Sequence, residues 1–167
     1  IVSSLDATPD IAAARALLAE HLESVEGPPR RHRIVPTGPA PIHTAWLWPI
    51  RATVRKCTRT FSSAVELMDR DPAHRFTFPQ AQQYAWIEAR HPELFERIRD
   101  RVAAGQWLPV GGMWVEADMN LPSGESLARQ IVHGQRYFTE RFGSPCREVW
   151  IPDVFGYPAG LPQLFVA

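Results

Sequence analysis

The sequence predicts an α/β fold in which parallel strands alternate with covering helices. Short apolar runs and helical stripes follow one another in the order β-α-β-α-β-α-β, and this alternation is typical of a parallel sheet. The chain has 167 residues, of which 45% are hydrophobic and 22% charged, so it is long and apolar enough for a globular core. The strands of this pattern fit a small open sheet or half of a closed barrel, and we interpret the chain as an incomplete barrel.

A helix and a linker are expected before the alternating pattern. Residues 9–25 begin with Pro-Asp and carry a leucine stripe, which favours a helix. The run Gly-Pro-Pro-Arg-Arg at 27–31 then interrupts the chain. We therefore expect residues 1–30 to form an N-terminal helix and linker, and residues 31–167 to form the N-terminal part of an incomplete barrel domain.

The alternating pattern itself predicts strands and helices at defined positions. The strands are expected at the apolar runs 33–37, 75–78, 107–110 and 147–151. Apolar residues spaced three and four apart predict helices from Pro49 to about Met68, from Pro79 to Gly105 with an interruption at Pro92, and from Ser123 to Gly143. Parallel α/β folds bind ligands at the carboxyl ends of their strands, so the loops after these strands are the expected site.

Composition excludes some classes of partner. Eighteen basic and eighteen acidic residues give a net charge of zero, so we expect no nucleic-acid partner. No apolar run approaches the ~20 residues of a membrane span, so we expect no membrane partner. Cys57 and Cys146 form no Cys-x-x-Cys motif, which favours a reducing, cytoplasmic location.

The expected loops bring together carboxylates, a histidine and aromatic side chains. They contain His43, Trp46, Glu116, Asp118, Asp153 and Phe155. Aromatic rings cover the apolar faces of sugars, and paired carboxylates cleave glycosidic bonds. Histidine with aspartate is also a donor set for a divalent metal. The alternative from the residues alone is that the aromatic side chains close the barrel end and the acids cap helices.

The loop sequences also resemble a known family. The segments GGMWVEADMNLPSGESLARQ (111–130) and EVWIPDVFGYPAGLPQL (148–164) are similar to class II α-mannosidases, glycoside hydrolase family 38, of the cytosolic and bacterial type. The segments at 43–61 and 78–87 resemble the same family. The resemblance implies a seven-stranded β/α barrel and retaining, zinc-dependent hydrolysis of terminal α-mannosides in oligosaccharides.

The resemblance also assigns roles to individual residues. Asp153 matches the family's nucleophile, which is also a metal ligand; from the residues alone, a turn or helix cap is an equal alternative. Trp46 matches the aromatic floor of the mannose subsite, and Phe155 matches a wall position. Glu116 and Asp118 match acidic positions near the rim, where substrate binding and a capping role are both open.

The first loop departs from the family pattern. Where the family reads Gly-His-x-His-Ile-Asp-Thr-Ala-Trp, this chain has proline at positions 39 and 41 and His43 in place of the aspartate. Pro41 has no donor atom, and His43 exchanges a charged oxygen for a neutral nitrogen. The expected zinc ligands are therefore only His43 and Asp153.

Three functional interpretations follow. The first is a catalytic-domain fragment of an α-mannosidase that is inactive alone, because the resemblance places a further metal ligand and the general acid downstream of the matched segments. The second is a carbohydrate-binding remnant that has lost its metal. The third is a structural or interaction domain that closes its open sheet against another chain, for example as a homo-oligomer.

Overall fold

The computed structural model describes residues 11–23 and 35–166. The chain divides into two compact units, Ile1–Val35 and Pro36–Ala167, which are considered separately here. The first unit contains the helix α1, Ile11–Glu23, which confirms the helix expected at 9–25. The expected domain boundary at residues 30 and 31 lies outside the described residues and stays a prediction.

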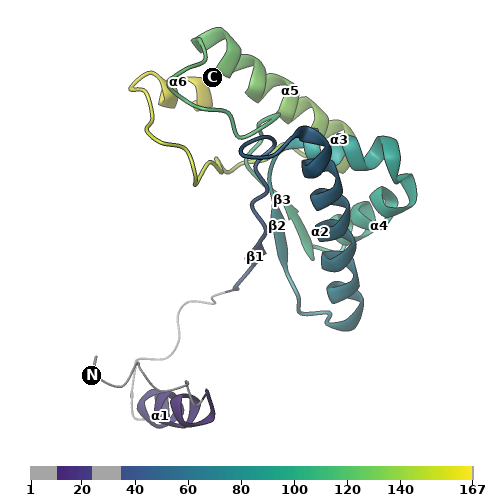
Figure 1. The fold of residues 1–167 in the computed structure, drawn as a ribbon, viewed down its shortest axis with the longest axis vertical. Coiled ribbons are helices and arrows are strands. Elements are labelled where there is room, and N and C mark those ends of the chain that lie inside the picture. Colours follow the sequence, from purple (N-terminus) through teal and green to yellow (C-terminus); the bar gives the residue numbers. More distant parts are fainter. Residues whose placement is uncertain (1–10, 24–34, 167) are drawn as a thin grey trace. The chain divides into compact units, whose positions relative to one another are not determined.

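The second unit contains a small parallel sheet (Figure 1). Its strands are β1, Gly38–Pro39, β2, Phe76–Phe78, and β3, Trp107–Pro109, in the order β1-β2-β3. Gly38 is paired with Phe76, and Phe76 with Trp107. The expected α/β class with parallel strands is therefore confirmed, and the described residues form an open sheet.

The first strand was expected at 33–37 but begins later, and the expected position is wrong. Residues 33 and 34 lie outside the described part, and pairing with β2 starts where the Gly38 N–H donates to the Arg75 carbonyl at 3.1 Å. Alternate residues of a strand face the same neighbour, so Pro36 also faces β2. Proline has no N–H to donate, and this delays pairing until Gly38.

The fourth expected strand, at 147–151, is also wrong, since no strand forms there. The Val110 N–H donates to the Phe78 carbonyl and the Phe76 N–H to the Gln106 carbonyl. Residues 106, 108 and 110 therefore face β2, and Pro109 faces the free edge of β3. At that edge Trp107 keeps its N–H but Pro109 has none, which weakens the ladder that a fourth strand would join.

The helices follow the expected positions. They are α2, Ile50–Arg70, α3, Ala81–Arg90, α4, Pro92–Ala103, and α5, Gly124–Phe142. Pro92 begins α4 and separates it from α3, as expected. Ser123 caps α5 by accepting a hydrogen bond from the Ser126 N–H at 3.2 Å. A short helix, α6 at Leu161–Val166, was not predicted. Among the described residues, none of the helices is both long enough and apolar enough to cross a membrane.

Two apolar clusters hold this unit together. The larger one packs α2, α3, α4 and α5 around the sheet and centres on fully buried aromatic rings such as Phe61 and Trp107. The Trp107 indole donates to the Tyr84 hydroxyl at 2.7 Å, which donates to the Phe78 carbonyl at 2.9 Å. The buried polar atoms of these rings are thus satisfied, as a closely packed core requires.

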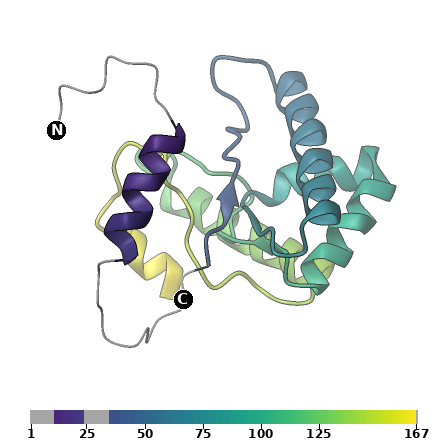
Figure 2. The same cartoon turned by 90° about the horizontal axis from the view of Figure 1, so that it is seen from below.

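The smaller cluster positions the C-terminal segment. It contains Met113, Met119, Leu127, Ile151 and Leu161. Figure 2 shows the segment after α5 running back along that helix to α6. Leu161 of α6 and Leu127 in the first turn of α5 belong to this cluster, and the two helices are in contact. The loop that joins them lines the pocket with the loops after β1 and β3.

Candidate active site

A pocket of about 640 Å³ contains most of the predicted site residues. Its lining includes His43 and Trp46 from the loop after β1, Glu116 from the loop after β3, and Asp153 and Phe155 from the segment before α6. Five of the six predicted side chains thus share one pocket. A second pocket of about 420 Å³ is lined by apolar and aromatic side chains such as Tyr157 and Phe165 and contains no charged side chain, so the first is the candidate active site.

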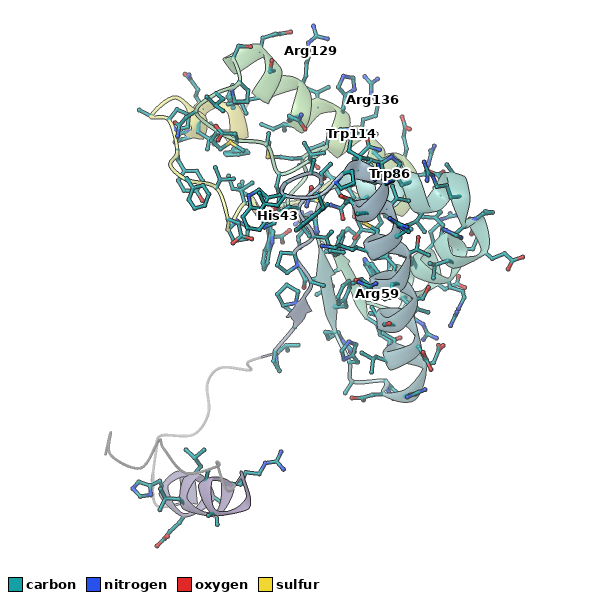
Figure 3. The ribbon with its side chains drawn as sticks, viewed as in Figure 1. His43, Arg59, Trp86, Trp114, Arg129 and Arg136 are labelled. Carbon is teal, nitrogen blue, oxygen red and sulfur yellow. The ribbon has the colours of Figure 1, made fainter. Side chains whose placement is uncertain are left out.

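His43 and Asp153 face each other across the pocket. His43 Nε2 lies 3.6 Å from Asp153 Oδ2, and both side chains are partly exposed, at 34% and 46%. At this distance the two side chains form an ion pair when the imidazole is protonated. Because both are partly exposed, both remain accessible to a ligand. Figure 3 shows His43 in the loop before α2, beside the C-terminal segment.

Two tryptophans form an aromatic platform next to His43. The Trp46 ring meets His43 edge-on at 5.6 Å between centroids and Trp48 edge-on at 5.8 Å. The Lys56 ammonium lies 3.3 Å from the centre of the Trp48 ring, which is cation–π geometry. Trp46 remains 65% exposed, so its face is free for a ligand. Trp46 is therefore not part of the core.

Phe155 is 90% exposed at the other side of the pocket. The loop that carries it is tied down at two points. Asn120 Nδ2 donates to the Phe155 carbonyl at 3.2 Å, and the Tyr157 hydroxyl donates to the Ile151 carbonyl at 2.7 Å. Asp153 lies between these points, so its backbone is held even though its carboxylate is open to solvent.

Glu116 is held by a close approach of its loop to α5. The N–H groups of Trp114 and Val115 donate to the carbonyl and side-chain oxygens of Gln130, both at 2.9 Å. Gly134 makes this approach possible, because a Cβ built there would lie 2.4 Å from the Gly112 carbonyl oxygen. Only a residue without a Cβ fits this position.

The carboxyl of Glu116 is the least satisfied polar group of the pocket. Its Oε1 is buried and has no hydrogen-bond partner among the described residues. Burial, with a smaller contribution from the negative charge of Asp153, raises the pKa of Glu116 to about 7. Near neutral pH the protonated and the ionised forms of Glu116 are therefore both populated. The protonated form can donate a hydrogen bond to a ligand, and the ionised form can accept one.

Asp118 does not line the pocket. Its Oδ1 accepts hydrogen bonds from the N–H groups of Asn120 and Leu121, both at 2.8 Å. This is the geometry of an aspartate that stabilises a turn. The structure thus gives Asp118 the capping role left open by the sequence, and its role in substrate binding gains no support from its position.

The donor atoms of the pocket do not by themselves fit a catalytic zinc ion. Such sites use three protein ligands and an open position. Within residues 11–23 and 35–166, no group of three or more histidine, cysteine, aspartate or glutamate side chains is placed to hold a metal. His43 and Asp153 supply two donors at most.

Two buried glutamines beneath the first loop were not predicted. Gln80 and Gln83 are 1% and 0% exposed and bond to the residues on both sides of His43. Three glutamines follow β2 within four positions, 80 to 83. A polar cluster at the carboxyl end of a buried strand is the signal that could have identified them.

Comparison with known proteins identifies the family. Residues 33–167 match the N-terminal domain of glycosyl hydrolases family 38. The chain is 46% identical over 158 residues to human alpha-mannosidase 2C1, covering 95% of this chain and 15% of that protein. It is 49% identical over 124 residues to an alpha-mannosidase of Saccharomyces cerevisiae, covering 74% of this chain and 11% of that protein.

A solved structure shares the fold. The alpha-mannosidase of Enterococcus faecalis V583 superposes with a TM-score of 0.71 at 22% identity, over 78% of this chain and 15% of that one. The chain thus spans about one seventh of the length of the relatives it matches. The sequence match over nearly all of its second unit shows that this chain belongs to glycosyl hydrolases family 38, as a part of the N-terminal domain.

Proposed function

We propose that the chain provides the nucleophile and part of the mannose subsite of a retaining α-mannosidase that acts on terminal α-mannosides of oligosaccharides. The observation that carries this proposal is the shared pocket of Asp153, Trp46 and Phe155. Its support is the family membership together with an accessible carboxylate between two exposed aromatic rings. The seven-stranded barrel belongs to the same proposal, and so does the cytoplasmic location.

In this proposal Asp153 attacks the anomeric carbon of the mannoside. A bond forms between its Oδ and C1, and the bond from C1 to the leaving oxygen breaks with its electron pair. The leaving oxygen takes a proton from a general acid, and water then hydrolyses the mannosyl ester. Trp46 and Phe155 hold the apolar faces of the sugar, and Glu116 accepts or donates a hydrogen bond to a hydroxyl.

We further propose that the chain alone does not turn over ordinary mannosides. Zinc would supply binding to the sugar hydroxyls, but among the described residues no three histidine, cysteine, aspartate or glutamate side chains are placed to hold it. The expected general acid also lies outside the matched segments. Hydrolysis of an aryl α-mannoside above the level of Asp153→Asn would contradict this part of the proposal.

A substrate with a very good leaving group tests the nucleophile separately from the acid. A 5-fluoro-α-mannosyl fluoride needs little help from an acid, since fluoride leaves readily. We expect intact-mass spectrometry to show one added fluoromannosyl group, and peptide mapping to place it on Asp153. Asp153→Asn should stay unlabelled, and Asp118→Asn should label like the parent because Asp118 lies outside the pocket.

A carbohydrate-binding role is the second candidate. The incomplete metal donor set and the exposed faces of Trp46 and Phe155 favour it. Binding of α-methyl mannoside without any labelling of Asp153 would favour this role over the nucleophile. Loss of both binding and labelling would leave the structural or interaction domain, whose test is the oligomeric state in solution.

A further inference from the structure

The loop that carries His43 and Trp46 is not held by its own backbone. In the part of the chain that the structure describes, residues 41–48, which follow the last strand bond of β1, make no backbone–backbone hydrogen bond. A loop of this kind is expected to sample many conformations unless side chains hold it. Its conformation therefore depends on side-chain bonds from neighbouring helices.

Two glutamines at the start of α3 supply these bonds. Gln80 Oε1 accepts from the Thr44 hydroxyl at 2.5 Å, and its Nε2 donates to the Ile42 carbonyl at 2.9 Å. Gln83 Nε2 donates to the same carbonyl at 2.5 Å and to Thr44 Oγ1 at 3.2 Å. The residues immediately before and after His43 are thus each bonded to both glutamines.

A third bond fixes the chain just beyond His43. The Thr53 hydroxyl of α2 donates to the Thr44 carbonyl at 2.6 Å, and accepts from the Trp48 indole at 2.9 Å. The carbonyls of Ile42 and Thr44 are therefore both bonded. With the peptides on both sides held, the direction in which the His43 side chain leaves the backbone is set.

The local structure at Gln80 frees its side chain for this task. Gln80 is the N-cap residue of α3, yet its side chain makes no capping bond. The carbonyls of Met113 and Trp114 accept from the Ala81 and Gln82 N–H groups at 3.1 and 2.9 Å instead. Gln80 has a backbone φ of 69°. Among the described residues it is the one non-glycine residue with a positive φ. Glycine or asparagine would suit that conformation better, so a buried glutamine there is kept at a conformational cost.

We propose that Gln80 and Gln83 are positioning residues that aim His43 at Asp153 and present Trp46 to the pocket. They act through the backbone of the loop and touch no ligand themselves. The inference rests on the proposed function only in assigning His43 and Asp153 to the active site. The bonds from Gln80 and Gln83 to the loop are a property of the ligand-free protein.

The test uses the ring protons of His43, observed by NMR in the ligand-free chain at one fixed pH. The rings of Trp46 and Trp48 lie 5.6 and 6.4 Å from His43, so their ring currents should displace these resonances from those of a free histidine peptide. The carboxylate of Asp153 lies 3.6 Å away, so Asp153→Asn should shift them as well.

We expect Gln80→Met and Gln83→Met to abolish both effects. The His43 resonances should move towards free-peptide values and should no longer respond to Asp153→Asn. The matched control is Gln82→Met on the same helix, whose side chain accepts from the Trp114 indole at 3.1 Å, whereas its described hydrogen bonds include none to the loop. It should leave the His43 resonances in place.

Two results would overturn the inference. One is retention of the parental His43 resonances in folded Gln80→Met and Gln83→Met; the other is an equal shift in Gln82→Met, which would indicate only a general loss of packing. If the glutamine variants do not fold, Thr44→Val removes the hydroxyl that both glutamines bond while leaving α3 unchanged, and the same two outcomes apply. A separate titration with α-methyl mannoside tests the proposed function, because the ligand-free resonances do not depend on sugar binding.

Discussion

Replacing Glu116 by glutamine should change how the stability of the chain depends on pH. The carboxyl has a buried oxygen without a partner, and burial and the charge of Asp153 raise its pKa from 4.5 to about 7. The folded chain therefore holds more protons than the unfolded chain between these two values. Stability conferred by the protonated carboxyl is complete below pH 4.5 and is lost as the pH rises to about 7.

The size of the effect follows from the same shift. A shift of one pKa unit corresponds to about 1.4 kcal/mol, so the full change would be about 3 kcal/mol. The pocket is open to solvent, which screens the charge, and we therefore expect about 1–2 kcal/mol. Glu116→Gln keeps the shape and removes the charge, so it should match the parent near pH 4.5 and exceed its stability by that amount at pH 8.

Urea unfolding from pH 4 to pH 9 measures the difference between parent and variant, in which the other titrating groups cancel. A chelator keeps trace metal from binding Asp153. Glu125→Gln is the control, since Glu125 is exposed on α5 and paired with Arg129 at 2.8 Å. It keeps Glu116, so the difference in stability between the parent and Glu125→Gln should not change between pH 5 and pH 7. A parent–variant difference that is constant across this range would refute the reasoning about Glu116.

Two further predictions concern the loop after β3 and the metal donors. Gly134→Ala should destabilise the chain by about 1–3 kcal/mol in urea unfolding, because the new Cβ meets the Gly112 carbonyl at 2.4 Å; Gly124→Ala, with nothing within 4 Å, should be neutral or stabilising, and equal effects would contradict the close approach. Zinc titrated into the chain by calorimetry should bind weakly, and His43→Ala should abolish that signal; unchanged binding would show that His43 is not a ligand.

The helices and the location of the site could be predicted from the sequence because both depend on local patterns. The stripe of α2 and the prolines at 49 and 92 act within a few residues of the features they determine. The rule that parallel strands end at one edge brings together His43 and Glu116, which follow β1 and β3. Asp153 lines the same pocket although no strand precedes it.

The errors have a different physical origin. Both mistaken strands have enough apolar residues. In the expected strand 33–37, Pro36 lacks the N–H for pairing with β2; for the expected strand 147–151, Pro109 lacks an N–H at the edge of its expected neighbour β3. The facing edge depends on the register with a neighbour, which a single run of sequence does not contain. The same holds for Gln80, because its bonds to Thr44 and Ile42 cross 36 and 38 positions of sequence.

The pair His43–Asp153 is also informative about charge. In the family pattern that the first loop resembles, position 43 is an aspartate, and a carboxylate there would face Asp153, since His43 Nε2 lies 3.6 Å from Asp153 Oδ2. Two carboxylates at such a distance repel one another and require a cation or a shared proton. Histidine removes this repulsion, so the electrostatics of this pocket do not require a bound metal.

This argument predicts the outcome of restoring the family residue. An aspartate is shorter than histidine, so its carboxylate would lie farther than 3.6 Å from Asp153. At a surface-like dielectric, two like charges about 6 Å apart repel by about 3 kcal/mol, and partial exposure reduces this to about 1 kcal/mol. His43→Asp should therefore destabilise the metal-free chain by about 1 kcal/mol at pH 8, and added zinc should restore more stability than it gives the parent. His43→Asn is the control, because it lacks the charge, and it should not gain this response to zinc. Equal unfolding midpoints for His43→Asp and His43→Asn without metal would show that the side chain at position 43 does not sense the charge of Asp153.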